Sequence, residues 1–226
     1  MTPTPAPAPA PAAKARARRI LKALYAQYPD AHCELDYASP HELLIATILS
    51  AQTTDVGVNK ATPKLFAKFP KPADYAAATP RSIEPYVKSL GFFRMKARAI
   101  HESMKTIERD FGGTVPDTMQ DLLALRGVAR KTANVVLGNA YAINEGVVVD
   151  THVMRLSQRF DLTGHTNPVK IERDLMALFP RDEWTMLSHL LIRHGRRVCK
   201  ARGGECARDT ICRRYCSNAK TSRVAR

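Results

Sequence analysis

Long apolar runs are missing from this sequence of 226 residues. No stretch approaches the roughly 18 consecutive apolar residues that a transmembrane helix needs, so no membrane span is expected. A secretory signal peptide is missing as well, because Thr2 to Ala13 alternates proline with alanine where an apolar segment would stand. We therefore expect a cytoplasmic, nucleoid-associated protein.

Acidic residues are scarce: 21 Asp and Glu stand against 35 Lys and Arg, which gives a net charge of +14. The imbalance lies at the ends, since residues 1–19 carry +4 and residues 196–226 carry +8. With 45% hydrophobic and 25% charged residues, the composition is that of a globular protein, which excludes a disordered or collagen-like chain. The basic excess indicates a polyanionic partner.

Strand patterns are almost absent. The one β-rich run, 147–149, is too short to found a sheet, whereas apolar residues recur at helical spacing along most of the chain. Ser39, followed by a proline and a glutamate, predicts a capped helix start, and Asp55 and Asp117 are the expected caps of two later helices. We predict an all-α protein, with further helices near 80–88, 95–110, 117–125, 130–142, 151–160, 167–178 and 183–195.

Cysteine is rare, yet four of the five cysteines fall within 18 residues with the spacing C-x6-C-x5-C-x3-C: Cys199, Cys206, Cys212 and Cys216. In a chain without a secretory signal, such a cluster favours metal binding over disulfides. Four thiolates suit either zinc or an iron–sulfur cluster, and the wide first spacing favours a cubane-type cluster. Cys33 stands alone and is expected to be a buried, inert thiol.

Residues 119–142 contain two apolar-periodic helices around a short turn that includes Gly127. This pattern is typical of a helix-hairpin-helix, whose turn and following helix start offer backbone N–H groups to a DNA phosphate without reading sequence. An ordinary αα-hairpin has the same spacing. The pattern alone leaves both interpretations open.

Four segments resemble the endonuclease III family of helix-hairpin-helix DNA glycosylases. Leu125–Leu137 is similar to the family's hairpin and catalytic lysine, and Val149–Arg155 is similar to the segment that follows them. Leu49–Asp55 and Ile192–Arg196 match two further family blocks, the second just ahead of the cysteine cluster. The blocks occur in the family's order and cover about residues 20–216.

The resemblance implies a two-domain helix-hairpin-helix glycosylase fold with an iron–sulfur cluster loop. It places a six-helix domain at 33–143 and a cluster domain at 16–32 plus 144–216, with DNA in the groove between them. The four clustered cysteines would hold a [4Fe–4S] cluster, with zinc as the alternative. Outside these domains we expect a disordered Pro/Ala arm at 1–15 and a basic tail at 217–226.

By resemblance, Lys131 and Asp150 are the catalytic residues of a bifunctional DNA glycosylase and AP lyase that removes oxidised pyrimidines in base excision repair. The Lys131 amine would displace the damaged base and form a Schiff base, from which β-elimination cuts the strand. Asp150 is expected both to cap a helix and to stabilise positive charge on the sugar. The partner is a duplex with an oxidised base or an abasic site, bound by a monomer. His152 is expected to be structural.

Further DNA contacts are implied by the same resemblance. Gln52 would fill the hole left by the extruded base. Phe92 would act as a wedge, with core packing as the alternative for this side chain. The hairpin candidates are Arg126, Gly127, Ala129, Arg130 and Thr132.

Two motifs depart from the family pattern. The family hairpin usually reads Leu-Pro-Gly-x-Gly, where this chain has Arg126 for the proline and Ala129 for the second glycine. The methyl of Ala129 would obstruct phosphate approach or strain the turn, and Arg126 is a candidate replacement phosphate contact. The usual cysteine spacing, C-x6-C-x2-C-x5-C, puts Asp209 and Tyr215 at the third and fourth positions. Cys212 and Cys216 lie close enough in the sequence to serve as the third and fourth ligands in place of cysteines at those positions, provided that the loop takes a different path.

Two other functions stay open at this point. An adenine glycosylase of the same superfamily would carry a glutamate where this chain has Thr47, and it would lack the catalytic lysine. A non-catalytic or weakly active DNA-binding paralogue with a structural metal cluster would account for the unusual hairpin and cysteine spacing. Retention of both Lys131 and Asp150 counts against that paralogue.

Overall fold

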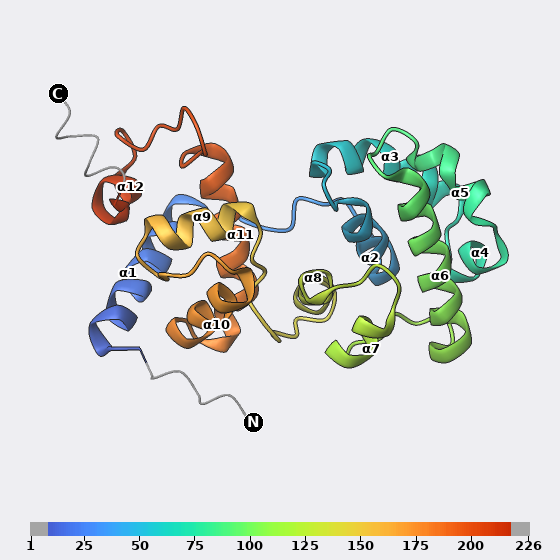
Figure 1. The fold of residues 1–226 in the computed structure, drawn as a ribbon, viewed down its shortest axis with the longest axis horizontal. Coiled ribbons are helices and arrows are strands. Elements are labelled where there is room, and N and C mark those ends of the chain that lie inside the picture. The colour runs from blue at the N-terminus through green and yellow to red at the C-terminus, as the bar shows by residue number, and fades with distance from the viewer. Residues whose placement is uncertain (1–8, 218–226) are drawn as a thin grey trace. The chain divides into compact units, whose positions relative to one another are not determined.

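The computed structural model describes residues 9–217, and every regular element in that range is helical (Figure 1). The expected all-α class is therefore confirmed. The run 147–149 forms no strand. None of the helices described is long and apolar enough to cross a membrane.

One compact unit comprises Cys33–Glu145. Its helices are α2 (Pro40–Leu49), α3 (Asp55–Lys68), α4 (Pro72–Ala77), α5 (Pro80–Val87), α6 (Phe93–Phe111), α7 (Met119–Ala124) and α8 (Arg130–Ala140). These are seven helices where six were expected, because the short α4 forms a segment of its own. Pro72 begins it, and the Asp74 carboxylate accepts a hydrogen bond of 2.8 Å from the Lys71 backbone N–H.

The long helix α6 organises this unit. Helices α4 and α5 pack against it, while α2 packs on both α6 and α8. Helix α2 is apolar on nearly all sides, so seven of its ten residues are buried. Ser39 caps it with Pro40 at the first helical position, as predicted.

Two other helix caps were predicted one residue away from where they lie. Thr54 caps α3 and Thr118 caps α7, whereas Asp55 is already the first residue of its helix and Asp117 precedes the cap. Threonine and aspartate both accept a hydrogen bond from a helix N–H. Either residue of the pairs Thr54–Asp55 and Asp117–Thr118 could serve as the cap by its chemistry, so the position at which the first helical turn begins decides between them.

The second compact unit takes the chain up to His32 and again from Gly146, so the division falls after Glu145. Its helices are α1 (Pro11–Gln27), α9 (Thr151–Arg159), α10 (Pro168–Leu178), α11 (Trp184–Arg197) and α12 (Thr210–Tyr215), with a 3-10 turn η1 (Arg181–Glu183). Helix α1 packs on α10, α11 and α12, and α9 packs on α10 and α11. Ile20, Leu24 and Phe160 are fully buried in the core that results.

Helix α1 corrects the expected extent of the disordered arm. It begins at Pro11, so residues 11–15 are helical rather than part of the arm. Proline is well accommodated at the first position of a helix and the alanines after it favour helix, while Ala17 is already fully buried in the core. The remainder of the predicted arm at 1–8 and of the basic tail at 218–226 lies outside the described residues.

Candidate functional site

The predicted hairpin is formed by α7, a turn at 125–129 and α8. Gly127 has a φ of 78°, and a Cβ added there would lie 3.0 Å from the Cβ of Ala99 on α6. The turn therefore requires glycine both for its backbone conformation and for its close approach to α6. Ser103 of α6 anchors the turn further, because its hydroxyl donates a 2.6 Å hydrogen bond to the carbonyl of Arg126.

Ala129 fits the hairpin without strain. Its φ is −101°, which any L-residue adopts, so the predicted strain at this position is wrong. Ala129 is the N-cap of α8, and no described side chain caps this helix start. The first N–H groups of a helix have no intrahelical partners, so this end suits an anion. Lys131, the second residue of α8, is exposed, and Thr132 beside it is half-buried.

The hairpin arginines have partners within their own unit. Arg126 Nη1 lies 2.8 Å from Glu102 Oε2, and Arg98 Nε lies 2.7 Å from the other oxygen of the same carboxylate. The hydrogen bonds from Arg98 and Arg126 lower the pKa of Glu102. Arg130 Nη2 donates a 3.0 Å hydrogen bond to the carbonyl of Glu145. The guanidiniums of Arg126 and Arg130 are therefore oriented by contacts within this unit.

Gln52 and Phe92 share two unusual features. Both have left-handed backbone, with φ of 54° and 58°, and both line one pocket. Phe92 is 59% exposed, so it is not a core residue and the core-packing alternative is wrong. An exposed aromatic ring and an exposed amide beside one pocket are groups that can stack on and hydrogen-bond to a nucleobase.

Asp150 caps α9 in the second unit. Its Oδ1 accepts hydrogen bonds of 2.8 Å from the backbone N–H groups of both His152 and Val153, which confirms the capping prediction. These bonds hold the carboxylate at the helix start in one orientation. His152 Nδ1 lies 3.1 Å from Arg155 Nη2, and burial lowers the pKa of this histidine, in line with a structural role.

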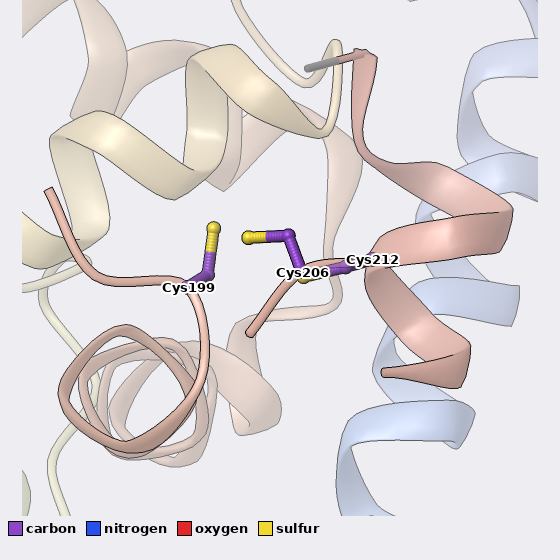
Figure 2. A group of neighbouring side chains, drawn as sticks. All are labelled: Cys199, Cys206 and Cys212. Atoms are coloured by element: carbon purple, nitrogen blue, oxygen red, sulfur yellow. The ribbon is translucent and has the colours of Figure 1, made fainter. Parts of the chain in front are cut away.

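The clustered cysteines form one group of sulfur atoms. The Sγ atoms of Cys199, Cys206 and Cys212 all lie within 4.8 Å of one another. Figure 2 shows Cys199 and Cys206 with their sulfurs turned toward each other and Cys212 beside them on α12. Cys216 is buried as well and is close enough to Cys199 to influence the pKa of its thiol. All but Cys206 are buried.

The crowded sulfurs compete for protons. Hydrogen bonds from Cys212 and Cys216 lower the pKa of the Cys199 thiol to about 4, whereas the hydrogen bond to Cys199 raises the pKa of Cys212. A metal centre binds thiolates and balances their charge, so the four sulfurs fit a metal cluster. Cys33 lies apart from this group and packs against the core of its unit, where it is only partly buried rather than buried as expected.

Comparison with known proteins shows which family the chain belongs to. Residues 45–181 match the model of the HhH-GPD superfamily base excision DNA repair proteins. The chain is 52% identical to Endonuclease III of Synechocystis sp. over 196 residues, which covers 85% of this chain and 90% of the relative. It belongs to the endonuclease III family.

Two solved endonuclease III structures share the fold. One is a non-covalent complex of Endonuclease III with DNA, with a TM-score of 0.88, 38% identity and coverage of 94% of this chain and 99% of the other. The second is a trapped covalent intermediate of Endonuclease III with DNA, with a TM-score of 0.87, 38% identity and coverage of 93% and 98%.

The loop around the sulfurs departs from the endonuclease III pattern in a definite way. Asp209, at the usual third cysteine position, caps α12 by accepting a 2.8 Å hydrogen bond from the Cys212 N–H. Its other oxygen accepts one of 2.7 Å from Gln27 Nε2. Tyr215, at the usual fourth position, is buried in the core of the unit. Helix α12 carries Cys212 in its first turn, and Cys216 is its C-cap, so both later cysteines stand on or beside this short helix.

Sequence reasoning missed the side chains that surround the sulfurs. Arg159 Nη1 donates to Cys199 Sγ at 3.1 Å. His194 Nε2 lies 3.2 Å from Cys212 Sγ, and its Nδ1 lies 2.9 Å from the Tyr28 hydroxyl. His194 is fully buried, and burial lowers its pKa. Its position in a block shared with the endonuclease III family was the available signal, whereas nothing in the sequence marked Arg159.

Proposed function

We propose that this member of the endonuclease III family is a bifunctional DNA glycosylase and AP lyase that removes oxidised pyrimidines from duplex DNA. One observation carries the proposal: Lys131 is an exposed lysine in the first turn of α8, directly after the hairpin turn, where no described side chain caps the helix. A relative with 38% identity has been solved as a trapped covalent intermediate with DNA. A lysine amine is the side chain that the motif offers for such a bond.

Lys131 accounts for both steps of the reaction. Its amine attacks the sugar C1′ while the bond between C1′ and the base breaks, and the base leaves with the bonding electrons and takes up a proton. Loss of the amine proton and ring opening give a Schiff base between Nζ and C1′. The iminium acidifies the C2′ hydrogens, and removal of one expels the 3′ phosphate by β-elimination. Water then hydrolyses the Schiff base and frees the lysine.

Asp150 supports the first of these steps. Positive charge develops on the sugar as the base departs, and a carboxylate held in one orientation stabilises that charge better than a mobile one. The two backbone N–H groups that bind Oδ1 supply the fixed orientation and leave the other oxygen available.

DNA binding is divided between backbone and side chains. The uncapped start of α8 and the turn around Gly127 offer amides to a phosphate, which fixes position without reading sequence. Gln52 and Phe92 fill the space that the extruded nucleotide leaves. We further propose that the protein acts as a monomer, in the cytoplasm on nucleoid DNA.

The metal centre that we propose is a [4Fe–4S] cluster held by Cys199, Cys206, Cys212 and Cys216. Four thiolate ligands at these wide spacings suit a cubane cluster, while zinc sites usually use closely paired cysteines. When bound, the cluster supplies structural cross-linking of the loop. The guanidinium of Arg159 and the imidazole of His194 would then donate to ligand sulfurs.

The alternative of an adenine glycosylase is disfavoured by Thr47. This residue takes the position of the glutamate acid in that group, but its hydroxyl donates a 2.7 Å hydrogen bond to the carbonyl of Leu43 within α2. Thr47 is only 4% exposed. It therefore has neither the chemistry nor the access that protonation of a base requires.

Borohydride trapping tests the proposed function. Wild type should be captured covalently on a duplex with an abasic site, because borohydride reduces the Schiff base to a stable amine. Lys131→Ala should abolish trapping while it leaves DNA binding largely intact. Lys105→Ala, which removes another exposed lysine of the same unit, serves as the matched control. Equal trapping by Lys131→Ala and wild type would refute the assignment.

Asp150→Asn separates the two steps. It should slow removal of a damaged base far more than cleavage at a preformed abasic site, because stabilisation of sugar charge belongs to the first step. Single-turnover rates on the two substrates measure the difference. An equal fall in both rates would show that Asp150 acts through capping alone.

The metal content tests the proposed cluster. Protein purified without oxygen should be yellow-brown, absorb broadly near ~400 nm and hold about four irons per chain. Zinc without iron would instead support the alternative of a tetrahedral thiolate site.

A further inference from the structure

Two residues proposed to enter the duplex share an uncommon backbone conformation. Four non-glycine residues of the described range have positive φ, and Gln52 and Phe92 are two of them. They come from separate segments, since Gln52 follows α2 and Phe92 immediately precedes α6. A residue with a side chain stays in this conformation only where surrounding contacts impose it. Contacts within this unit must therefore hold both backbones.

Lys96 makes hydrogen bonds to both segments. Its Nζ donates to Thr53 Oγ1 at 2.7 Å, and its backbone N–H donates to the carbonyl of Phe92 at 3.1 Å. The Thr53 hydroxyl in turn donates to the carbonyl of Ala51 at 3.4 Å. The chain of hydrogen bonds thus runs from α6 to the residues on either side of Gln52.

Lys96 is unusually buried for a lysine. The residue is 5% exposed, and burial lowers its pKa. Its side-chain hydrogen-bond partner in the described range is the neutral Thr53 hydroxyl rather than a carboxylate. A lysine is rarely buried to this extent, which draws attention to its contact with Thr53 within the unit.

A pocket of about 230 Å³ lies against Lys96. It is lined by Ile48, Ala51, Gln52, Phe92, Met95, Lys96, Ala99 and Gly127. The lining joins three segments proposed to contact DNA: the loop after α2, the start of α6 and the hairpin turn. The side chain of Lys96 joins the first two, because it extends from the first turn of α6 and donates to Thr53 in the loop after α2.

We infer that Lys96 is a positioning residue that fixes the Gln52 loop against the start of α6, so that Gln52 and Phe92 enter the duplex as one preformed unit. This inference rests on the proposed function. A preformed pair of inserting groups spares the ordering cost that two loose loops would pay during base extrusion. Lys96 acts through Gln52 and Phe92, without touching the reacting sugar.

The test compares two substrates. Removal of a paired, oxidised pyrimidine requires unpairing and extrusion, whereas cleavage at a preformed abasic site has no base to unpair. Lys96→Met keeps the length of the side chain but loses the ammonium group. It should lower kcat/KM for the paired lesion by about tenfold, because small misplacements of positioning groups have effects of this order. Strand cleavage at the abasic site should change by less than about threefold.

A second pair of variants keeps the test decisive if Lys96→Met folds poorly. Thr53→Val removes the hydroxyl that accepts from Lys96 and should reproduce the selective loss, whereas Thr53→Ser keeps the hydroxyl and should retain most of the activity. 2-Aminopurine opposite the lesion reports insertion directly. Its fluorescence should rise on binding wild type and rise less with Lys96→Met or Thr53→Val.

Stability is controlled with Ile107→Val, a fully buried position of the same helix α6. If wild type neither removes the base nor cuts the abasic strand, the proposed function fails and the inference falls with it. If wild type acts on both substrates but Lys96→Met slows them equally, or no more than Ile107→Val does, the inference alone is overturned.

Discussion

The hairpin turn at 125–129 and the cysteine loop at 199–216 both depart from the endonuclease III pattern, and the chain accommodates the two departures differently. In the hairpin, Arg126 and Ala129 replace family residues, and Gly127 provides the positive φ of the turn. In the cysteine loop, Cys212 lies on the short helix α12 and Cys216 is the C-cap of that helix, while Asp209 and Tyr215 hold the positions where the family has cysteine.

The difference follows from which atoms are needed. A phosphate contact through backbone amides depends on φ and ψ, so side chains can change wherever the new residue adopts the same backbone. Ala129 does so at a φ of −101°. A metal centre depends on the sulfur atoms themselves, so a cysteine lost at one position has to be replaced by another whose sulfur reaches the same place. Backbone sites thus tolerate substitution, while side-chain sites require the loop to be rebuilt.

The largest expected effect concerns the rebuilt loop. Cys216→Ser should lower the iron content well below that of wild type and remove the absorption near ~400 nm. The reason is that a hydroxyl is a poor substitute for a thiolate ligand. Cys33→Ser, outside the group of sulfurs, is the control and should keep the metal. Iron analysis of protein prepared without oxygen decides. A full iron content in Cys216→Ser would show that the fourth ligand is another residue.

Gly127→Ala tests the backbone side of the comparison. The added methyl meets the Ala99 Cβ at 3.0 Å, and the φ of 78° disfavours any side chain. We expect a loss of at least about 1 kcal/mol in the free energy of unfolding, with weaker binding to every duplex. Ala129→Gly, two residues on, should leave DNA affinity unchanged or raise it. Equal effects of the two changes would mean that the turn has no special backbone requirement.

Asp209→Ala should have an intermediate effect. It removes the cap of α12, which costs about 1 kcal/mol for a typical helix cap and lowers the Tm by roughly 2–4 °C in a chain of this size. Asp209→Asn retains an oxygen that can accept from the Cys212 N–H and should stay near wild type. Thermal unfolding of both variants with intact metal measures the difference. A loss of metal from Asp209→Asn as well would point to direct metal binding by Asp209.

The smallest expected effect belongs to Arg126. If its guanidinium contacts a phosphate, Arg126→Ala should weaken binding to all duplexes alike and flatten the salt dependence by roughly one unit. Arg98→Ala is the matched control, because Arg98 binds the same Glu102 carboxylate from within α6. If the salt dependence of binding is the same in Arg126→Ala as in wild type, Arg126 makes no phosphate contact and pairs only with Glu102.

Local patterns predicted much of the fold. The cap at Ser39, the helix containing Lys131 and the cap at Asp150 depend on neighbouring residues, and all three are as expected. One error concerns the chain start. Residues 11–15 are expected to be disordered from composition, yet they are helical, because proline and alanine are compatible with a helix start and the helix continues into Ala17, Ile20 and Leu24, which are buried in the core.

The sequence by itself determined the helical class, the family blocks and the residue types of the proposed catalytic and metal sites, because periodicity and motif spacing are local properties. Only the tertiary structure decided which atoms meet. The Arg126–Glu102 pair, the contact of Gly127 with Ala99, the burial of Lys96 and the hydrogen bond from Arg159 to Cys199 each join separate helices or a helix and a loop. Such contacts depend on how helices pack, which residue spacing along the chain does not specify.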